Sequence, residues 1–223
     1  MLFFISVCIY ERHYPFFKTA EHDISFTAKE EAMMIKPSFF ELIEANPVIA
    51  AVKDDNGLST CCSCDDIKVV FILYGDICSI EKIVRKIKQA GKIAMVHIDL
   101  MEGLSCKEIA VDFIRAHTLA DGIISTRPSL IKRGKELGLY TTLRIFLLDS
   151  MSYENIPKQM ANAKPDMLEI LPGLMPKIIR RVTKMAKVPV IAGGLISDRE
   201  DVMNALSAGA ISVSSTNPAV WMM

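Results

Sequence analysis

Glycines and hydroxyl side chains follow two apolar runs near the carboxyl end of the chain. Gly193-Gly194 follows Val190-Ile191-Ala192, and Ser214-Ser215-Thr216 follows Ile211-Ser212-Val213. Glycine lets backbone N–H groups approach an anion closely, and hydroxyls add further donors. Either motif alone would be explained equally well by an ordinary turn. Because both stand at the ends of consecutive predicted strands, they predict a phosphate-binding site.

Acidic and basic side chains follow other predicted strands. His97 and Asp99 are two residues apart, so on a strand their side chains would share one face, and Glu169 is expected to point inward from a later strand. Arg127 and Arg144 carry planar guanidinium groups that could clamp a phosphate or a carboxylate. Such a set suits acid–base catalysis, but it would equally hydrogen-bond a polyol, and His97 could also be purely structural.

Short apolar runs alternate with amphipathic stretches of helical period, which is typical of βαβ units around a parallel sheet. Eight such runs predict a single, small (β/α)8 TIM-like barrel, with an open flavodoxin-like sheet as the alternative. The expected strands cover residues 48–52, 68–74, 93–98, 122–125, 140–146, 167–171, 190–192 and 211–214. Helices are expected over about 77–89, 105–117, 153–162, 175–186 and 198–207, with one more ending near residues 137–138.

The first crossover is the weak point of this pattern. Residues 54–60 and the cluster Cys61-Cys62-Ser63-Cys64 have too little apolar periodicity for a full helix, so a weak or missing first helix is expected. The six cysteines are clustered irregularly, which favours reduced thiols over a disulfide framework. A closed zinc site needs four ligands at wider spacing, so we interpret the cluster as plain loop thiols.

The amino-terminal segment does not continue the pattern. Residues 11–32 show no steady periodicity, and residues 29–33 can be encoded by a ribosome-binding sequence followed by a start codon at Met33. We therefore interpret residues 1–36 as a non-native or disordered extension, with the true start at Met33 or Met34, and residues 37–223 as the barrel. The alternative is a genuine amino-terminal arm with a hydrophobic tip.

Bulk composition excludes several classes of protein. The 223 residues contain 26 Lys and Arg against 26 Asp and Glu, so the net charge does not mark a binder of polyanions. No run approaches the ~20 apolar residues that span a bilayer, and the apolar first ten residues lack the basic start and cleavage site of a signal peptide. We expect a cytoplasmic protein without a resident cofactor or metal.

Two predicted helices carry basic side chains on one face. Solvated outer faces are the simplest explanation, but each face could contact the phosphates of an extended RNA. These side chains are Lys82, Arg85, Lys86 and Lys88 on the helix after strand two, and Lys177, Arg180, Arg181, Lys184 and Lys187 on the helix after strand six.

An ordered set of motifs resembles the glycerol-3-phosphate-responsive antiterminator (GlpP) family of bacterial regulators. The resemblance runs from about Pro47 to the carboxyl terminus, while residues 1–36 have no counterpart in the family pattern. Its motifs are Met95-Val96-His97-Ile98-Asp99-Leu100, Gly122-Ile123-Ile124-Ser125-Thr126-Arg127, Arg144-Ile145-Phe146-Leu147-Leu148-Asp149, Pro165-Asp166-Met167-Leu168-Glu169-Ile170-Leu171-Pro172-Gly173, Ala192-Gly193-Gly194-Leu195-Ile196, Ala208-Gly209-Ala210 and Trp221.

The resemblance implies a barrel that senses glycerol 3-phosphate and, when loaded, binds the leader mRNA of glycerol-catabolism genes to prevent premature termination of transcription. In this interpretation Arg127 and Arg144 are charge partners of the ligand. The resemblance also implies a regulator that is not an enzyme, and it leaves room for a homodimer. The phosphate would lie on Gly193, Gly194, Ser214, Ser215 and Thr216, and the glycerol hydroxyls on His97, Asp99 and Glu169.

Two other functions stay open. The first is an enzyme on the same scaffold: a phosphosugar isomerase, an aldolase or a glycerophosphodiesterase. Lys53 is the only obvious candidate for a Schiff-base lysine at an inner strand end, and only His97, Asp99 and Glu169 could hold a metal. The second is a ligand-binding barrel that acts through a protein partner.

Overall fold

The computed structural model describes residues 39–223. The chain divides into two units, and the second, Pro37–Met223, contains all of the described elements. The predictions that residues 1–36 are a non-native or disordered extension, and that translation starts at Met33 or Met34, lie outside the described residues.

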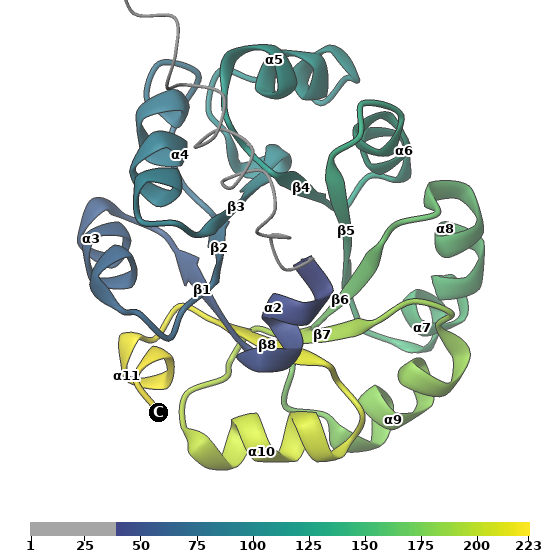
Figure 1. Cartoon of the computed structure of the whole chain (residues 1–223). Helices are drawn as coiled ribbons and strands as arrows, with labels where there is room; N and C mark the ends of the chain where they lie inside the picture. Colours follow the sequence, from purple (N-terminus) through teal and green to yellow (C-terminus); the bar gives the residue numbers. More distant parts are fainter. Residues whose placement is uncertain (1–38) are drawn as a thin grey trace, which may run out of the picture. The chain divides into compact units, whose positions relative to one another are not determined.

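Eight parallel strands form one closed barrel in the order in which they occur in the chain (Figure 1). They are β1 (Val48–Val52), β2 (Val69–Ile72), β3 (Ile93–His97), β4 (Gly122–Ser125), β5 (Tyr140–Phe146), β6 (Met167–Leu171), β7 (Val190–Gly193) and β8 (Ser212–Ser215). β8 closes the barrel by pairing with β1, with Ser214 opposite Ile49. The predicted (β/α)8 barrel is therefore confirmed, and the open flavodoxin-like sheet is not found.

The strands are buried on both faces, which explains why they read as continuous apolar runs. In β2, Val69 and Phe71 point into the barrel, where they join an interior cluster, whereas Val70 and Ile72 pack in the outer layer beneath the helices. All four side chains are almost fully buried. Alternation along each strand therefore sends every second side chain into the barrel, and this places the polar residues of the mouth.

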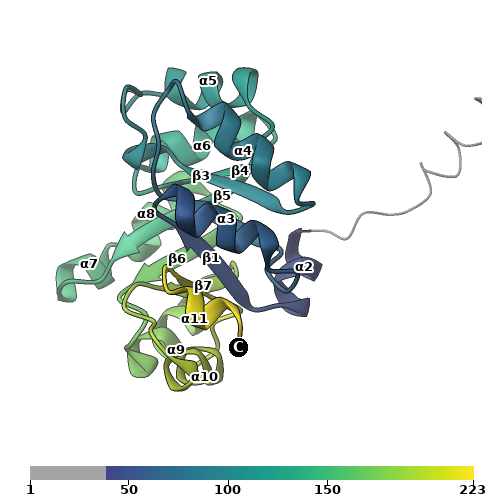
Figure 2. The ribbon, with the colours of Figure 1, turned by 90° about the vertical axis from the view of Figure 1, so that its left-hand side faces the viewer.

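Helices surround the barrel (Figures 1 and 2). They are α2 (Phe39–Ala45), α3 (Asp55–Ser63), α4 (Ile80–Gln89), α5 (Ile109–His117), α6 (Pro128–Glu136), α7 (Ser150–Glu154), α8 (Ile156–Ala163), α9 (Pro176–Met185), α10 (Arg199–Ser207) and α11 (Pro218–Trp221), with a short 3-10 turn η1 (Ile98–Leu100). The helix predicted near 153–162 is divided into α7 and α8, and Pro157 stands in the first turn of α8. Within residues 39–223, none of these helices has the length and apolar character needed to cross a membrane.

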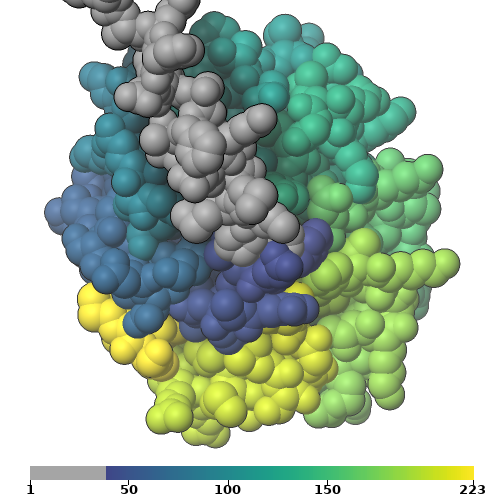
Figure 3. All heavy atoms as spheres, in the orientation of Figure 1, coloured from purple at the N-terminus to yellow at the C-terminus, as the bar shows by residue number. Residues whose placement is uncertain are grey.

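α2 covers the amino ends of the strands. Phe39 and Ile43 are buried in the same cluster as Ile49 and Phe71 of the barrel interior, and the ring of Phe39 stacks on that of Tyr140, the first residue of β5, at 4.8 Å. Figures 1 and 3 show α2 lying across this end of the barrel. Because apolar side chains fill the amino end, access to the barrel interior must come from the carboxyl ends of the strands.

The expectation of a weak or missing first helix was wrong in that α3 fills the first crossover. Asp54 caps the helix by accepting a hydrogen bond from the backbone N–H of Gly57 at 2.7 Å. Only Leu58 and Cys61 of α3 are buried, so its apolar face is too narrow to give a clear period. Cys61 and Cys62 lie on α3 and Cys64 ends it, so the cluster is helical, and the description as loop thiols was wrong as well.

Candidate functional site at the barrel mouth

Polar side chains from several strands gather at the carboxyl end of the barrel. Strand alternation points Arg144 of β5, Glu169 of β6 and Ser214 of β8 toward the interior, and all three are buried. His97, the last residue of β3, is also buried, with 3% of its surface exposed. The structure therefore brings together four of the side chains that the sequence assigned to ligand binding.

Glu169 is the centre of this cluster and is fully buried. Its Oε2 accepts a hydrogen bond from Nε of Arg144 at 2.5 Å, and its Oε1 accepts one from Oγ of Ser214 at 2.6 Å. Arg144 and Glu169 are register partners on adjacent strands, which fixes the pair. A buried ion pair is tolerated when hydrogen bonds satisfy both charges, so Arg144 and Glu169 each depend on the other.

The two glycines at the end of β7 have different roles. A Cβ on Gly193 would lie 2.5 Å from Oε1 of Glu169 and 2.5 Å from Oγ of Ser214, so glycine leaves the space that this hydrogen bond occupies. Gly194 has a φ of +75°, a backbone conformation that other residues rarely adopt. The glycine pair was predicted as a phosphate cradle, and Gly193 also has a packing function that the prediction did not include.

The hydroxyls at the end of β8 differ in whether they already form hydrogen bonds within the protein. Ser214 is bonded to Glu169, and Ser215 donates from Oγ to the backbone oxygen of Ile196 at 2.7 Å. Thr216 is exposed and lines a cavity of about 240 Å³ together with Lys53, which follows β1. Thr216 is therefore the hydroxyl of this segment most open to a ligand.

His97 is a neutral imidazole in the folded protein. Burial, with a smaller contribution from the positive charge of Arg144, lowers the pKa of His97 to about 4, although Asp99 acts in the opposite direction. Its Nδ1 is buried, has no hydrogen-bond partner among residues 39–223, and lies 3.8 Å from Oδ2 of Asp99. An unsatisfied buried nitrogen is costly, so a ligand hydroxyl that reached it would stabilise the folded state.

Thr142 was missed by the sequence interpretation. It lies on β5 two residues before Arg144, so the two side chains share the inner face of that strand. Its Oγ1, like Nδ1 of His97, is buried and has no hydrogen-bond partner within the described residues. The only signal in the sequence was this two-residue spacing, which a threonine in an apolar strand does not make conspicuous.

Asp99 does not lie on β3 as predicted; it lies in η1, because the chain turns after His97. Its carboxylate accepts hydrogen bonds from the backbone N–H of Thr126 at 2.7 Å and from Oγ of Ser125 at 3.0 Å. Nε of Arg127, which is half exposed, also donates to Asp99, at 3.3 Å. Asp99 therefore organises the loop after β4 and holds Arg127 at the mouth, while strand alternation, the reason given for pairing it with His97, does not apply.

The two basic faces lie on opposite sides of the barrel, on α4 and α9 (Figure 1). On α4, Arg85 forms an ion pair with Glu81, and Lys88 pairs with Asp121 at 2.6 Å. The cations of α9 are exposed, and none of them takes part in the salt bridges found within residues 39–223. Those cations are Lys177, Arg180, Arg181 and Lys184. The α9 face therefore keeps its positive charge locally uncompensated.

Comparison with known proteins places this architecture in a family. A family model described as glycerol-3-phosphate responsive antiterminator matches residues 48–221. A relative from Escherichia coli (strain K12), the uncharacterized protein YgcP, is 47% identical over 182 residues, which cover 82% of this chain and 95% of YgcP.

Two solved structures with related names share the fold. The glycerol uptake operon antiterminator regulatory protein from Listeria monocytogenes superposes with a TM-score of 0.75 at 30% identity, over 78% of this chain and 94% of that protein. A glycerol uptake operon antiterminator-related protein from Thermotoga maritima gives a TM-score of 0.69 at 30% identity, over 80% and 99% of the respective chains.

Proposed function

The chain belongs to the family of glycerol-3-phosphate responsive antiterminators, and we propose that it binds glycerol 3-phosphate at the barrel mouth and, when loaded, leader mRNA. The observation that carries the ligand proposal is the buried Nδ1 of His97, which has no hydrogen-bond partner in the part of the chain that the structure describes and lies beside the network of Arg144, Glu169 and Ser214. A small polyol phosphate has hydroxyls that could pair with Nδ1 of His97, and it has an anionic group that could bind the loops after β7 and β8.

In the proposed complex the glycerol hydroxyls contact His97, Glu169 and Asp99. A neutral imidazole can accept a hydrogen bond at one ring nitrogen and donate from the other, which suits a hydroxyl. Glu169 accepts hydrogen bonds from Arg144 and Ser214 in the structure, so its carboxylate is placed as an acceptor at this site. A polyol hydroxyl that donates to Nδ1 of His97 would satisfy a buried atom that has no partner within the described residues.

The phosphate is proposed to lie on the loops after β7 and β8. The positive φ of Gly194 turns the backbone there, and Ser215 ends the neighbouring strand β8, with Thr216 directly after it. These loops form the recurrent phosphate site of the fold. Arg127 is the more available of the two proposed charge partners, because it is half exposed, whereas Arg144 is buried against Glu169.

For the RNA we propose the α9 face. Backbone phosphates dominate the affinity of RNA-binding proteins, and they require cations that are exposed and not already neutralised. Lys177, Arg180, Arg181 and Lys184 meet that requirement better than Lys82, Arg85 and Lys86 of α4, where Arg85 already has a partner. Such a regulator would work in the cytoplasm, without a cofactor.

We propose no catalytic role for the mouth. Lys53 is exposed, and Glu169 and Asp99 are both engaged by protein donors. Incubation of the protein with glycerol 3-phosphate, triose phosphates and glycerophosphodiesters, with and without divalent metal, tests this directly. A turnover that disappears in Glu169→Gln would establish the enzyme alternative instead.

The ligand proposal is tested by thermal unfolding with glycerol 3-phosphate, and with glycerol and inorganic phosphate as separate comparisons. At ~100 times its Kd a ligand adds about 2.7 kcal/mol to stability, which corresponds to a rise in Tm of roughly 5–10 °C for a domain of this size. Neither glycerol nor phosphate alone should reach this shift at the same concentration.

Gly194 offers a matched pair of variants for the phosphate. Asparagine and aspartate have nearly the same shape, and both tolerate a positive φ better than other residues. We expect Gly194→Asn to retain most of the shift and Gly194→Asp to lose it, because only aspartate brings a negative charge to the anion site. If both folded variants respond like the parent protein, the phosphate lies elsewhere.

A further inference from the structure

A second cavity lies on the outer wall of the barrel. It has a volume of about 470 Å³ and is lined by residues of α8, of the ends of α6 and α9, and of the segments that lead into β6 and β7. None of its lining residues belongs to the mouth, so this site does not depend on the proposed function. Its volume falls in the range of roughly 300–1,000 Å³ that is typical of small-molecule sites.

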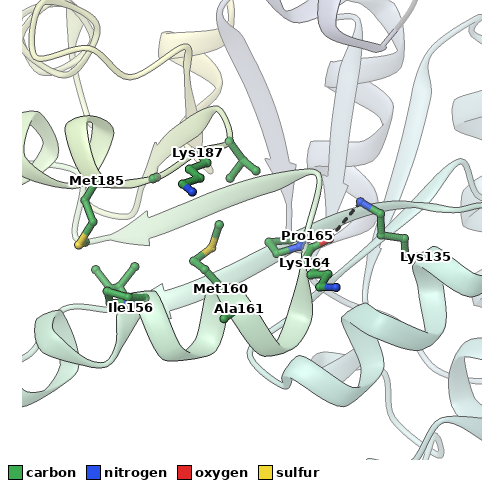
Figure 4. A pocket seen from close by; sticks show the side chains of 11 residues that line it. Lys135, Ile156, Met160, Ala161, Lys164, Pro165, Met185 and Lys187 are labelled. Carbon is green, nitrogen blue, oxygen red and sulfur yellow. Dashed lines mark hydrogen bonds between the residues drawn. The ribbon is translucent and has the colours of Figure 1, made fainter.

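One part of the cavity is apolar. Ile156 is buried beneath it, and Met160, Met185 and Val188 are partly buried and pack on the hydrophobic cluster between the strands and the outer helices. Figure 4 shows Ile156 and Met185 at one end of the hollow and Met160 in its middle. Methionine side chains are flexible and polarisable, so this lining can adapt to an aliphatic ligand.

The other part is basic. Lys135 and Lys164 lie at the end opposite Ile156, and Lys187 lies above Met160 in the view of Figure 4. Lys135 is occupied, because its Nζ donates to Oδ1 of Asp166 at 2.8 Å and to the backbone oxygen of Lys164. Within residues 39–223, Lys164 and Lys187 are exposed and form no salt bridge, and no acidic side chain lines the cavity.

We propose that this cavity binds a single aliphatic chain that ends in one anionic head group. The chain would lie against Ile156, Met160 and Met185, and the carboxylate or phosphate would meet Lys164 and Lys187. Apart from Lys164, Lys187 and Lys135, whose Nζ is already bonded to Asp166, the side chains of the lining are Ile, Pro, Met, Ala and Val. Since neutral polar side chains are absent from this lining, a sugar or a polyol would lose its hydrogen bonds with water there.

Isothermal titration of the full chain with dodecanoate, below its micelle concentration, is the direct test. We expect saturable binding of one molecule per chain. Affinity should rise about fourfold for each methylene between octanoate and dodecanoate, which corresponds to the burial of one CH₂ at each step. Dodecanol should bind at least fivefold more weakly than dodecanoate, because it lacks the charge.

Two sets of variants locate the binding. Met185→Trp fills the apolar end and should abolish binding, whereas the same change at Met203, an exposed residue of α10, should have no effect. Lys164→Glu combined with Lys187→Glu should weaken dodecanoate at least tenfold and leave dodecanol unchanged. Lys158 is exposed on α8 and does not line the cavity. Lys158→Glu therefore controls for the loss of positive charge on that helix.

The proposal fails if dodecanoate does not saturate, or if folded Met185→Trp binds it normally. Equal affinity for dodecanol and dodecanoate would overturn the anionic head group. Should Met185→Trp not fold, the paired lysine variants decide the matter, since they change only exposed residues. Sedimentation with phosphatidylglycerol vesicles separates a bilayer from a free chain: association with vesicles, but not with dodecanoate, would also contradict the proposal.

Discussion

Gly193 lies so close to Glu169 that a Cβ on the glycine would stand 2.5 Å from the Oε1 atom of the carboxylate. The same Cβ would also be 2.5 Å from Oγ of Ser214, the donor to that oxygen. Even the smallest side chain would therefore displace the group that anchors Arg144. The glycine at the end of β7 maintains the polar network of the mouth by leaving it space.

We therefore expect Gly193→Ala to destabilise the protein by about 3 kcal/mol, the order of magnitude for breaking a buried ion pair. Gly57→Ala is the control. Gly57 lies on helix α3, and a Cβ there would be 3.4 Å from the nearest neighbouring atom, which is an ordinary van der Waals distance. Urea-induced unfolding of both variants measures the difference. A Gly193→Ala protein as stable as the parent would show that Glu169 can move without cost.

The barrel could be predicted from the sequence because a parallel strand buried on both faces leaves an unmistakable apolar run. The predictions were wrong where an element buries few side chains or where the chain turns within a few residues. α3 presents only Leu58 and Cys61 to the core, and no period can be recognised from two residues. Asp99 was placed on a strand because spacing alone cannot show that the chain turns into η1 after His97.

For the mouth, the sequence identified residue types but not their partners. Arg144 was assigned to the ligand, yet its position opposite Glu169 depends on the register of β5 and β6, which the sequence does not reveal. The packing role of Gly193 has the same origin. Thr142 was recognised only from the structure, in which its buried hydroxyl has no partner between residues 39 and 223. The ligand contacts themselves stay predictions.

Because Arg144 and Glu169 pair with each other, replacing both should restore the stability of the protein without restoring its binding of glycerol 3-phosphate. Glu169→Leu should cost about 3–5 kcal/mol, because it leaves the guanidinium buried without its partner. Adding Arg144→Met should recover much of that loss, since an apolar pair of similar volume needs no counterion. Glycerol 3-phosphate should still fail to raise the Tm of the double variant, which thermal unfolding with and without ligand measures.

A double variant that regains both stability and the ligand response would remove Glu169 and Arg144 from the proposed site. If it regained neither, the two positions would be constrained by more than their mutual charge.

His97 should make stability depend on pH. The pKa of its imidazole is about 4 in the folded protein and about 6.5 in the unfolded chain, so between these values the unfolded state binds more protons. This contribution is fully present above pH 6.5 and is lost as the pH falls toward 4. From pH 7 to pH 5 the loss should be about 2 kcal/mol. Urea-induced unfolding at these two pH values measures it.

The matched variants for this prediction are His97→Gln and His117→Gln. His117 is exposed on α5, so its replacement should leave the pH dependence intact, whereas His97→Gln should reduce it. Carboxylates titrate in all three proteins and cancel in the comparison. An unchanged slope in His97→Gln would mean that His97 gains a proton in the folded state as readily as in the unfolded one.

The α9 face should carry the contact with RNA if the loaded barrel binds a leader transcript. Changing Arg180, Arg181 and Lys184 to glutamate should weaken RNA binding. It should also lower the magnitude of the slope of log affinity against log salt by about 2–3, because each phosphate that the protein no longer contacts keeps the ~0.7–0.9 of a counterion that binding would release. The response of Tm to glycerol 3-phosphate should be unaffected, because these side chains are exposed on the outer helix. Gel shifts at several salt concentrations, with and without the ligand, measure the effect.

The matched comparison is the reversal of Lys82, Arg85 and Lys86 on α4. Arg85 already pairs with Glu81, so this face has less free charge to offer, and because α4 and α9 lie on opposite sides of the barrel a monomer cannot apply both to one short hairpin. A larger loss from the α9 set supports the proposal. Equal losses would indicate a dimer or general electrostatic attraction. If neither set changed binding, the basic helices would have no part in it, and the mouth near Arg127, with Lys132 exposed on the following helix α6, would be the surface to test next.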